Sequence, residues 1–130
     1  VEVALQHRHR VGEALVDGAV ALRKGVPWFD AEDPLADAGP NTPDPRYTLA
    51  TVDLLVAVPL RFAPLPLRYQ GVVRAQTTRD ALFSQDFFSI GNRFTVRGFD
   101  GERTLAAERG WLVRNELATP LPLPGHELYA

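Results

Sequence analysis

The 130-residue sequence predicts an all-β protein, built as an antiparallel, up-and-down sheet of about six strands. Three observations predict this fold. Apolar and polar residues alternate with a period of two along six segments, as they do in strands whose two faces have unlike surroundings. The connections between the segments are alternately short and long. Finally, no apolar run approaches the roughly 20 residues that a membrane-spanning helix needs.

The first two segments form a predicted hairpin. From Val1 to Val11 the odd positions are mostly apolar and the even positions mostly polar. From Glu13 to Lys24 the apolar residues take the even positions instead, and Gly12 between the segments permits a tight turn.

The next two segments give the clearest alternation. Six of the seven even positions from Thr48 to Leu60 are apolar, within a predicted strand 47–60. In the strand 65–78 the odd positions are apolar or small apart from Tyr69, and the even positions carry a polar set: Arg68, Gln70, Arg74, Gln76 and Thr78.

Two more strands complete the prediction. Residues 110–118 place Trp111, Val113 and Leu117 opposite Arg114 and Glu116, with Asn115 as a polar exception on the apolar side. Residues 126–130 resemble the beginning of a sixth strand.

The lengths of the links between the strands indicate the surroundings of the sheet. Tight links join residues 11–13, 60–65 and 119–125, whereas residues 25–46 and 79–109 form long links. Short turns on one side and long loops on the other are typical of an outer-membrane β-barrel. An arginine facing lipid costs roughly 2–4 kcal/mol at mid-bilayer, so the face with Arg68 and Arg74 would be the lumen. A soluble sheet with one wet and one buried face also fits the alternation.

Composition excludes several classes of function. The chain is 45% hydrophobic and 23% charged, with a formal net charge of -2 and a pI near 5.9, so neither disorder nor a nucleic-acid partner is expected. It has no cysteine, which excludes disulfides, thiolate nucleophiles and cysteine metal sites. Because it also has no methionine, we expect it to be processed or cut from something longer.

The link 79–109 carries the most distinctive segment. Between Phe87 and Gly110 it has four phenylalanines and a dense run of charges, and a loop this apolar is expected to fold back onto a surface that buries them.

The run from Ile90 to Glu102, with Glu108-Arg109-Gly110 and Arg114-Asn115-Glu116-Leu117 after it, resembles the hemolysin activation/secretion proteins. These are the outer-membrane transporters of two-partner secretion, and their signature is Val-Arg-Gly-Phe/Tyr at the tip of a loop that enters the barrel. The match is sharpest over 83–117. Asn92 stands where the family commonly has a second glycine, a change that asparagine's tolerance of left-handed backbone makes mild.

The resemblance implies that residues 1–130 are part of a sixteen-stranded transmembrane β-barrel of the outer-membrane assembly and secretion superfamily. POTRA domains, a plug helix and the remaining strands would be absent from this chain. It implies a pore in the bacterial outer membrane, embedded in the lipid bilayer, that secretes a partner polypeptide of the hemolysin or adhesin type and can activate it. No catalysis, cofactor or nucleic acid is implied.

The resemblance also assigns roles within the loop. Arg97 would form a salt bridge from the loop tip to an acidic residue of the barrel wall, expected beyond Ala130. Removing one member of such a pair costs about 3–5 kcal/mol. Gly98 would allow a tight turn and Phe99 would pack on the wall. The motif is Val96, Arg97, Gly98, Phe99, Asp100, Gly101 and Glu102, supported by Gly91, Asn92 and Arg93.

Asp100 and Glu102 could tie the loop to lumen arginines such as Arg68, Arg74 or Arg114, and Glu116 is a further possible partner of the loop in the lumen. The alternative for both acids is plain solvated loop charge.

Other candidates are weaker. His7 and His9 share a strand face, but no third metal ligand is evident and His126 is alone, so no metal site is predicted. Trp28, Phe29 and Trp111 fit an aromatic girdle at a lipid interface, and core packing is the alternative for Trp111. Two other functions stay open: an assembly factor of the same superfamily, against which the length of the match around 91–102 argues, and a soluble all-β binding module.

Overall fold

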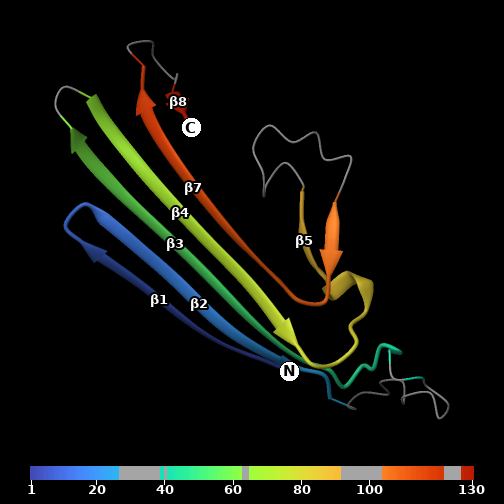
Figure 1. Ribbon diagram of the computed structural model, residues 1–130. Coiled ribbons are helices and arrows are strands. Elements are labelled where there is room, and N and C mark those ends of the chain that lie inside the picture. Colours follow the sequence, from blue (N-terminus) through green and yellow to red (C-terminus); the bar gives the residue numbers. More distant parts are fainter. Residues whose placement is uncertain (27–38, 40, 63–64, 92–103, 122–126) are drawn as a thin grey trace.

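The chain folds mainly as one antiparallel sheet of six strands, in the order β1-β2-β3-β4-β7-β8 (Figure 1). The computed structural model describes residues 1–26, 39, 41–62, 65–91, 104–121 and 127–130. The strands of the sheet are β1 Glu2–Val11, β2 Ala14–Lys24, β3 Thr48–Phe62, β4 Leu65–Thr78, β7 Gly110–Pro120 and β8 Glu127–Tyr129. The prediction of an antiparallel, all-β sheet of about six strands is confirmed, and β4 has the predicted bounds.

The segment between β4 and β7 contains more structure than its sequence predicted. A 3-10 turn, η1 (Ser84–Asp86), leads into β5 (Phe88–Ile90), which pairs with β6 (Leu105–Ala107) as a separate two-stranded sheet. In Figure 1 this small hairpin stands beside the main sheet. Gly91, after β5, has a φ of 96°, a backbone conformation that glycine adopts without strain.

One surface of the main sheet, the apolar face, carries the odd residues of β1, β4 and β7 and the even residues of β2 and β3. The registers align these residues in rows across the strands, such as Leu5, Val20, Val52, Ala75 and Trp111. Many of them are exposed despite being large and hydrophobic, including Leu5 at 75% and Trp111 at 73%. Within the described strands, Lys24 is the one lysine, arginine or acidic residue on this face.

The height of the apolar face matches a membrane. Its residues on β3 run from Ala50 to Leu60, and ten residue steps of about 3.3 Å cover about 33 Å along the strand. Strands of outer-membrane barrels tilt by roughly 40°, which leaves about 25 Å along the membrane normal, the height of a barrel's apolar band.

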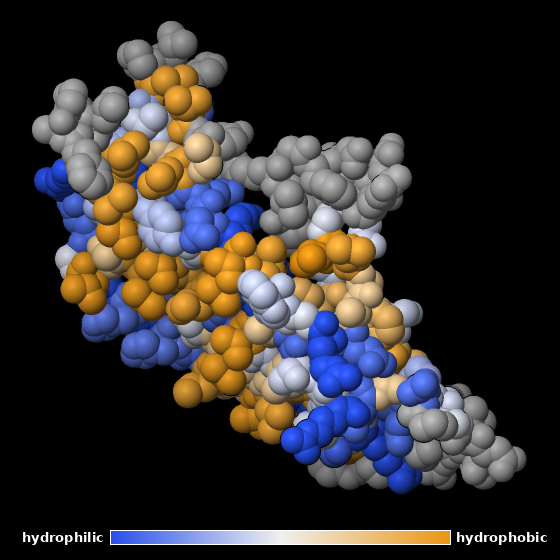
Figure 2. Space-filling model, in the orientation of Figure 1, coloured by the Kyte–Doolittle hydropathy of each residue, from blue (hydrophilic) through white to orange (hydrophobic). Residues whose placement is uncertain are grey.

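The opposite surface, the polar face, holds the charged residues of the strands other than Lys24. They include Arg8, Asp17, Asp53, Arg74 and Glu116. In the described part of the chain, only Leu49 and Leu82 are buried hydrophobic residues, so the sheet does not enclose a core of its own. Figure 2 shows a hydrophobic band along the sheet, bordered by hydrophilic patches, one of which lies at the end where β4 stops.

No helix in the described part of the chain is long and apolar enough to cross a membrane.

Asn115, the polar exception on the apolar face, has a partner there. The hydroxyl of Tyr69 on β4 donates a hydrogen bond to Oδ1 of Asn115 on β7, over 2.7 Å. Tyr69 lies over Gly71, because a Cβ at Gly71 would come within 2.8 Å of the tyrosine hydroxyl. An aromatic ring covering a glycine of the same strand is a known sheet-stabilising arrangement. The bond therefore satisfies a polar side chain that would otherwise face lipid alone.

Candidate functional site

The polar face is lined by ion pairs that join neighbouring strands. Arg8 on β1 pairs with Asp17 on β2. On the next two strands, Nε of Arg74 lies 2.8 Å from Oδ1 of Asp53. These groups arise from the alternation of the sequence, since the register places Asp53 opposite Arg74. Gln6, Asp17, Asp53 and Arg74 line a hollow of about 290 Å³ on this face.

Two further ion pairs lie toward β7 and β8. Nη2 of Arg68 lies 3.1 Å from Oε2 of Glu127, across the strand between them. Nε of Arg114 lies 3.4 Å from Oε1 of Glu116, and these side chains are 27% and 13% exposed. The Arg114–Glu116 pair is more enclosed than the Asp53–Arg74 pair, whose side chains are about half exposed.

The polar face also holds the base of the long loop, which we define as residues 79–91 and 104–109. Gln76 on β4 is the central contact. Its side-chain amide donates to the backbone oxygens of Asp86, at 2.7 Å, and Glu108, at 3.2 Å. Because Asp86 precedes the loop tip and Glu108 follows it, one glutamine binds both arms of the loop.

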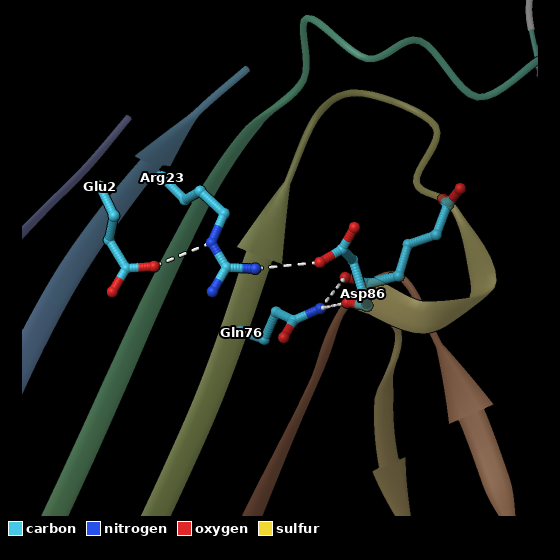
Figure 3. Close-up of polar contacts among 5 residues, drawn as sticks. Glu2, Arg23, Gln76 and Asp86 are labelled. Atoms are coloured by element: carbon cyan, nitrogen blue, oxygen red, sulfur yellow. Dashed lines mark hydrogen bonds and ion pairs between the residues drawn. The ribbon is translucent and has the colours of Figure 1, made fainter. Parts of the chain in front are cut away.

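Arg23 on β2 adds an ionic contact to the same arm (Figure 3). Its Nη1 donates to Oδ1 of Asp86 at 3.0 Å, while its Nε donates to Oε2 of Glu2 at 2.8 Å. The side chain of Asp86 is 10% exposed, so this pair is better shielded from solvent than most surface ion pairs. The loop base is thereby connected to β1, β2 and β4 at once.

Backbone amides complete the attachment. The amide of Leu82 donates to Oε1 of Glu108 at 3.1 Å, which ties the two arms to each other. The amide of Thr48 donates to Oδ2 of Asp80 at 2.6 Å. The hydroxyl of Thr78, itself 5% exposed, donates to the backbone oxygen of Thr48 at 2.7 Å. Bonds to charged groups are the stronger kind.

Phe88 of β5 packs against the first residue of β7, Gly110. A Cβ placed on Gly110 would lie 2.5 Å from Cδ1 of Phe88, so the phenylalanine ring lies directly on the glycine. Gly110 is opposite Gln76 in the β4–β7 register. Glycine is therefore required where β5 approaches the beginning of β7.

The structure accounts for part of the predicted site. Arg68, Arg74, Arg114 and Glu116 lie on the polar face, and each has an ion-pair partner within the sheet. Gly91 ends the first arm of the loop base. The rest of the predicted motif lies outside the described residues, namely Asn92, Arg93, Val96, Arg97, Gly98, Phe99, Asp100, Gly101 and Glu102. Trp28, Phe29 and His126 also lie outside them.

The remaining candidates are on the apolar face. The rings of His7 and His9 stack with centroids 5.9 Å apart. Among the described residues no group of three or more metal-ligating side chains occurs. Trp111 is one residue into β7 at the end of the long loops, and its 73% exposure excludes core packing within this sheet.

Sequence reasoning missed the loop base. Gln76 was assigned to the polar face, but Arg23, Asp80, Asp86 and Glu108 had no predicted role. Their contacts span between 2 and 63 residues of chain, and most of them join segments too distant for any local pattern to reveal. The one usable signal was Gly110, a glycine at the first position of a strand, which often marks a close approach of another segment.

An antiparallel sheet with a charge-poor apolar face about 25 Å high, and with ion pairs on its other face, defines the class: it is a segment of an outer-membrane β-barrel. The profile of the family described as haemolysin secretion/activation protein ShlB/FhaC/HecB matches residues 1–130. The chain belongs to this family.

Curated relatives agree. The chain is 35% identical to the outer membrane transporter CdiB-2 of Burkholderia pseudomallei (strain 1026b), over 100% of this chain and 22% of that protein. It is 26% identical to the hemolysin transporter protein HpmB of Proteus mirabilis, over 95% of this chain and 22% of that protein. The chain thus spans about a fifth of the length of the relatives it matches.

Solved structures give the same result. CdiB from Acinetobacter baumannii matches with a TM-score of 0.78 at 29% identity, over 98% of this chain and 21% of that one. CdiB from Escherichia coli matches with a TM-score of 0.80 at 25% identity, over 95% and 22%. The prediction of an outer-membrane location is confirmed, and the relatives are named as transporters.

Proposed function

We propose that the protein containing this chain is an outer-membrane pore that secretes, and can activate, a large partner protein of the hemolysin or adhesin type by two-partner secretion. The attachment of both arms of the long loop to the charged face carries this proposal. A loop whose base is attached to that face is in position to enter the conduit and contact a passing polypeptide. Family membership and the transporter relatives support the same function.

We also propose the arrangement of the whole protein. Residues 1–130 are a partial barrel, residues 79–109 form its lumen-entering signature loop, and the remaining strands and the POTRA domains belong to other parts of the protein. Arg97 pairs with an acidic wall residue, while Asp100 and Glu102 pair with wall arginines such as Arg68, Arg74 or Arg114. The wall arginines and Glu116 border the conduit, since they share the face to which the loop base is attached.

The test uses the complete transporter. We expect Arg97→Ala to reduce secretion of the partner at least tenfold while leaving the barrel inserted and heat-modifiable on gels. Removing one member of an enclosed ion pair leaves the other charge unpaired, which costs about 3–5 kcal/mol and frees the loop tip.

Arg109→Ala is the matched control, because Arg109 is an exposed arginine of the same loop with no ion pair among the described contacts. Normal secretion by membrane-inserted Arg97→Ala transporter, or an equal loss in Arg109→Ala, contradicts the proposal.

A further inference from the structure

A small polar zone closes the apolar face at the end from which the long loops leave. Lys24 and Thr48 are opposite each other in the β2–β3 register, and Thr77 is opposite Ala50 in the β3–β4 register. Arg79 comes one residue after β4. Thr48, Ala50, Thr77 and Arg79, with Thr78 and Asp80, line a hollow of about 440 Å³. The hollow therefore lies at the upper edge of the membrane-facing surface.

Hydrogen-bond donors are left over in this zone. Nζ of Lys24 donates to the backbone oxygen of Arg46, at 2.9 Å, and to Oγ1 of Thr48, at 2.8 Å. An ammonium group has three donors, so one remains, and the Thr48 hydroxyl can still donate its own hydrogen. Thr77 and Arg79 are exposed, and the described contacts include no hydrogen bond or ion pair from either side chain.

The acidic group of the hollow is already engaged. Oδ2 of Asp80 accepts the backbone amide of Thr48 at 2.6 Å. The zone thus offers two cations and two hydroxyls against one carboxylate. Arg79, Thr48 and Thr77 line the hollow, and Lys24 is next to it through its bond to Thr48. Arginine, lysine and hydroxyl donors are groups that bind a phosphate.

The position of the zone indicates which molecule would carry that phosphate. Outer-membrane barrels carry their long loops on the extracellular side, so the zone borders the outer leaflet. In that leaflet the lipid is a glycolipid whose sugar head group carries phosphates. Leu22 and Val52 continue the face below the hollow and are 53% and 41% exposed, which gives acyl chains an apolar surface. At the short-turn end this face finishes in Val11 and Leu60, with no charged residue on the described strands.

We propose that Lys24, Thr48, Thr77 and Arg79 form a binding site for a phosphate of an outer-leaflet glycolipid, lipid A being its phosphorylated core. Ala50, which also lines the hollow, has a small side chain that leaves room for the phosphate. The site fixes the height of the barrel at the strands that flank the signature loop. This inference rests on the outer-membrane location and not on the proposed secretion function.

The complete transporter, purified in detergent and freed of bound lipid, tests the site. Binding is measured by native mass spectrometry with three lipids: bisphosphorylated lipid A, the same lipid without phosphates, and phosphatidylglycerol. We expect only the first to bind tightly. Lys24→Gln/Arg79→Gln should weaken that binding at least tenfold, and Thr77→Val about threefold.

Arg61→Gln is the matched control, because it removes an exposed cation at the short-turn end, where Arg61 pairs with Glu13. It should bind lipid A as the unmodified protein does. The proposal is overturned if the double variant and Thr77→Val both bind within twofold of the unmodified protein. It is also overturned if dephosphorylated lipid A or phosphatidylglycerol binds equally well.

Discussion

The attachment of the loop base can be weakened at one side chain, Gln76. In Gln76→Leu the backbone oxygens of Asp86 and Glu108 lose their donor in a partly buried place. An unsatisfied buried acceptor costs about 1–3 kcal/mol, and we take the lower end because water reaches partly buried groups. With two acceptors at about 1 kcal/mol each, the free energy of opening the loop base should fall by about 2 kcal/mol. This corresponds to a roughly 30-fold increase in its open fraction.

Hydrogen–deuterium exchange of the complete transporter measures this opening. Peptides covering residues 80–91 and 104–109 should exchange about 30-fold faster in Gln76→Leu, while β1 to β4 stay unchanged. Gln70→Leu is the control, since Gln70 is on the same face of the same strand and its side chain makes no hydrogen bond in the described part of the chain. Unchanged exchange at 80–91, or an equal increase in Gln70→Leu, would show that Gln76 does not hold the loop.

Three further predictions test other parts of the structure. Gly110→Ala should destabilise the barrel by about 1–3 kcal/mol, because the new Cβ overlaps the Phe88 ring. Gly18→Ala is its control, since a Cβ there meets only an ordinary contact at 3.6 Å, and the midpoints of heat-modifiability of the two variants are compared. Leu54→Arg, on the apolar face, should cost about 2–4 kcal/mol of folding free energy in lipid vesicles. Leu55→Arg, beside the hollow with Asp17 and Asp53, should cost under about 1 kcal/mol, and equal costs would refute the assignment of the faces. Arg74→Gln should change stability by less than about 1 kcal/mol, since its ion pair is half exposed, yet shift the pore toward cation selectivity in reversal-potential measurements.

Most of the sheet was predictable because a strand's faces are set by a local repeat. The alternation of Leu65–Thr78 gave β4 its bounds and separated Arg74 from Val73 without any knowledge of neighbours. The other strands begin and end within two residues of the prediction, where turns rather than periodicity decide. Loop lengths gave the order of connections, since antiparallel neighbours joined by short turns must pair.

The loop base was not predictable from the same signals. Asp86 and Glu108 are 22 residues apart, and Gln76 binds the backbone oxygens of both, a contact that no period or motif encodes. Asn115 shows the same limit on the other face. Its polarity contradicted the pattern until Tyr69, 46 residues earlier, was found to donate to it.

The two faces of the sheet divide stability from function. A misplaced arginine on the apolar face costs about 2–4 kcal/mol, whereas each half-exposed ion pair of the polar face contributes about 0.2–1 kcal/mol. Charges of the polar face can therefore be exchanged at little cost in stability, while substitutions on the apolar face are constrained by the lipid. The loop base is the exception on the polar face, because Gln76, Arg23 and Glu108 concentrate several enclosed contacts at one end. That concentration holds the two arms of the loop base, 79–91 and 104–109, against the sheet and against each other.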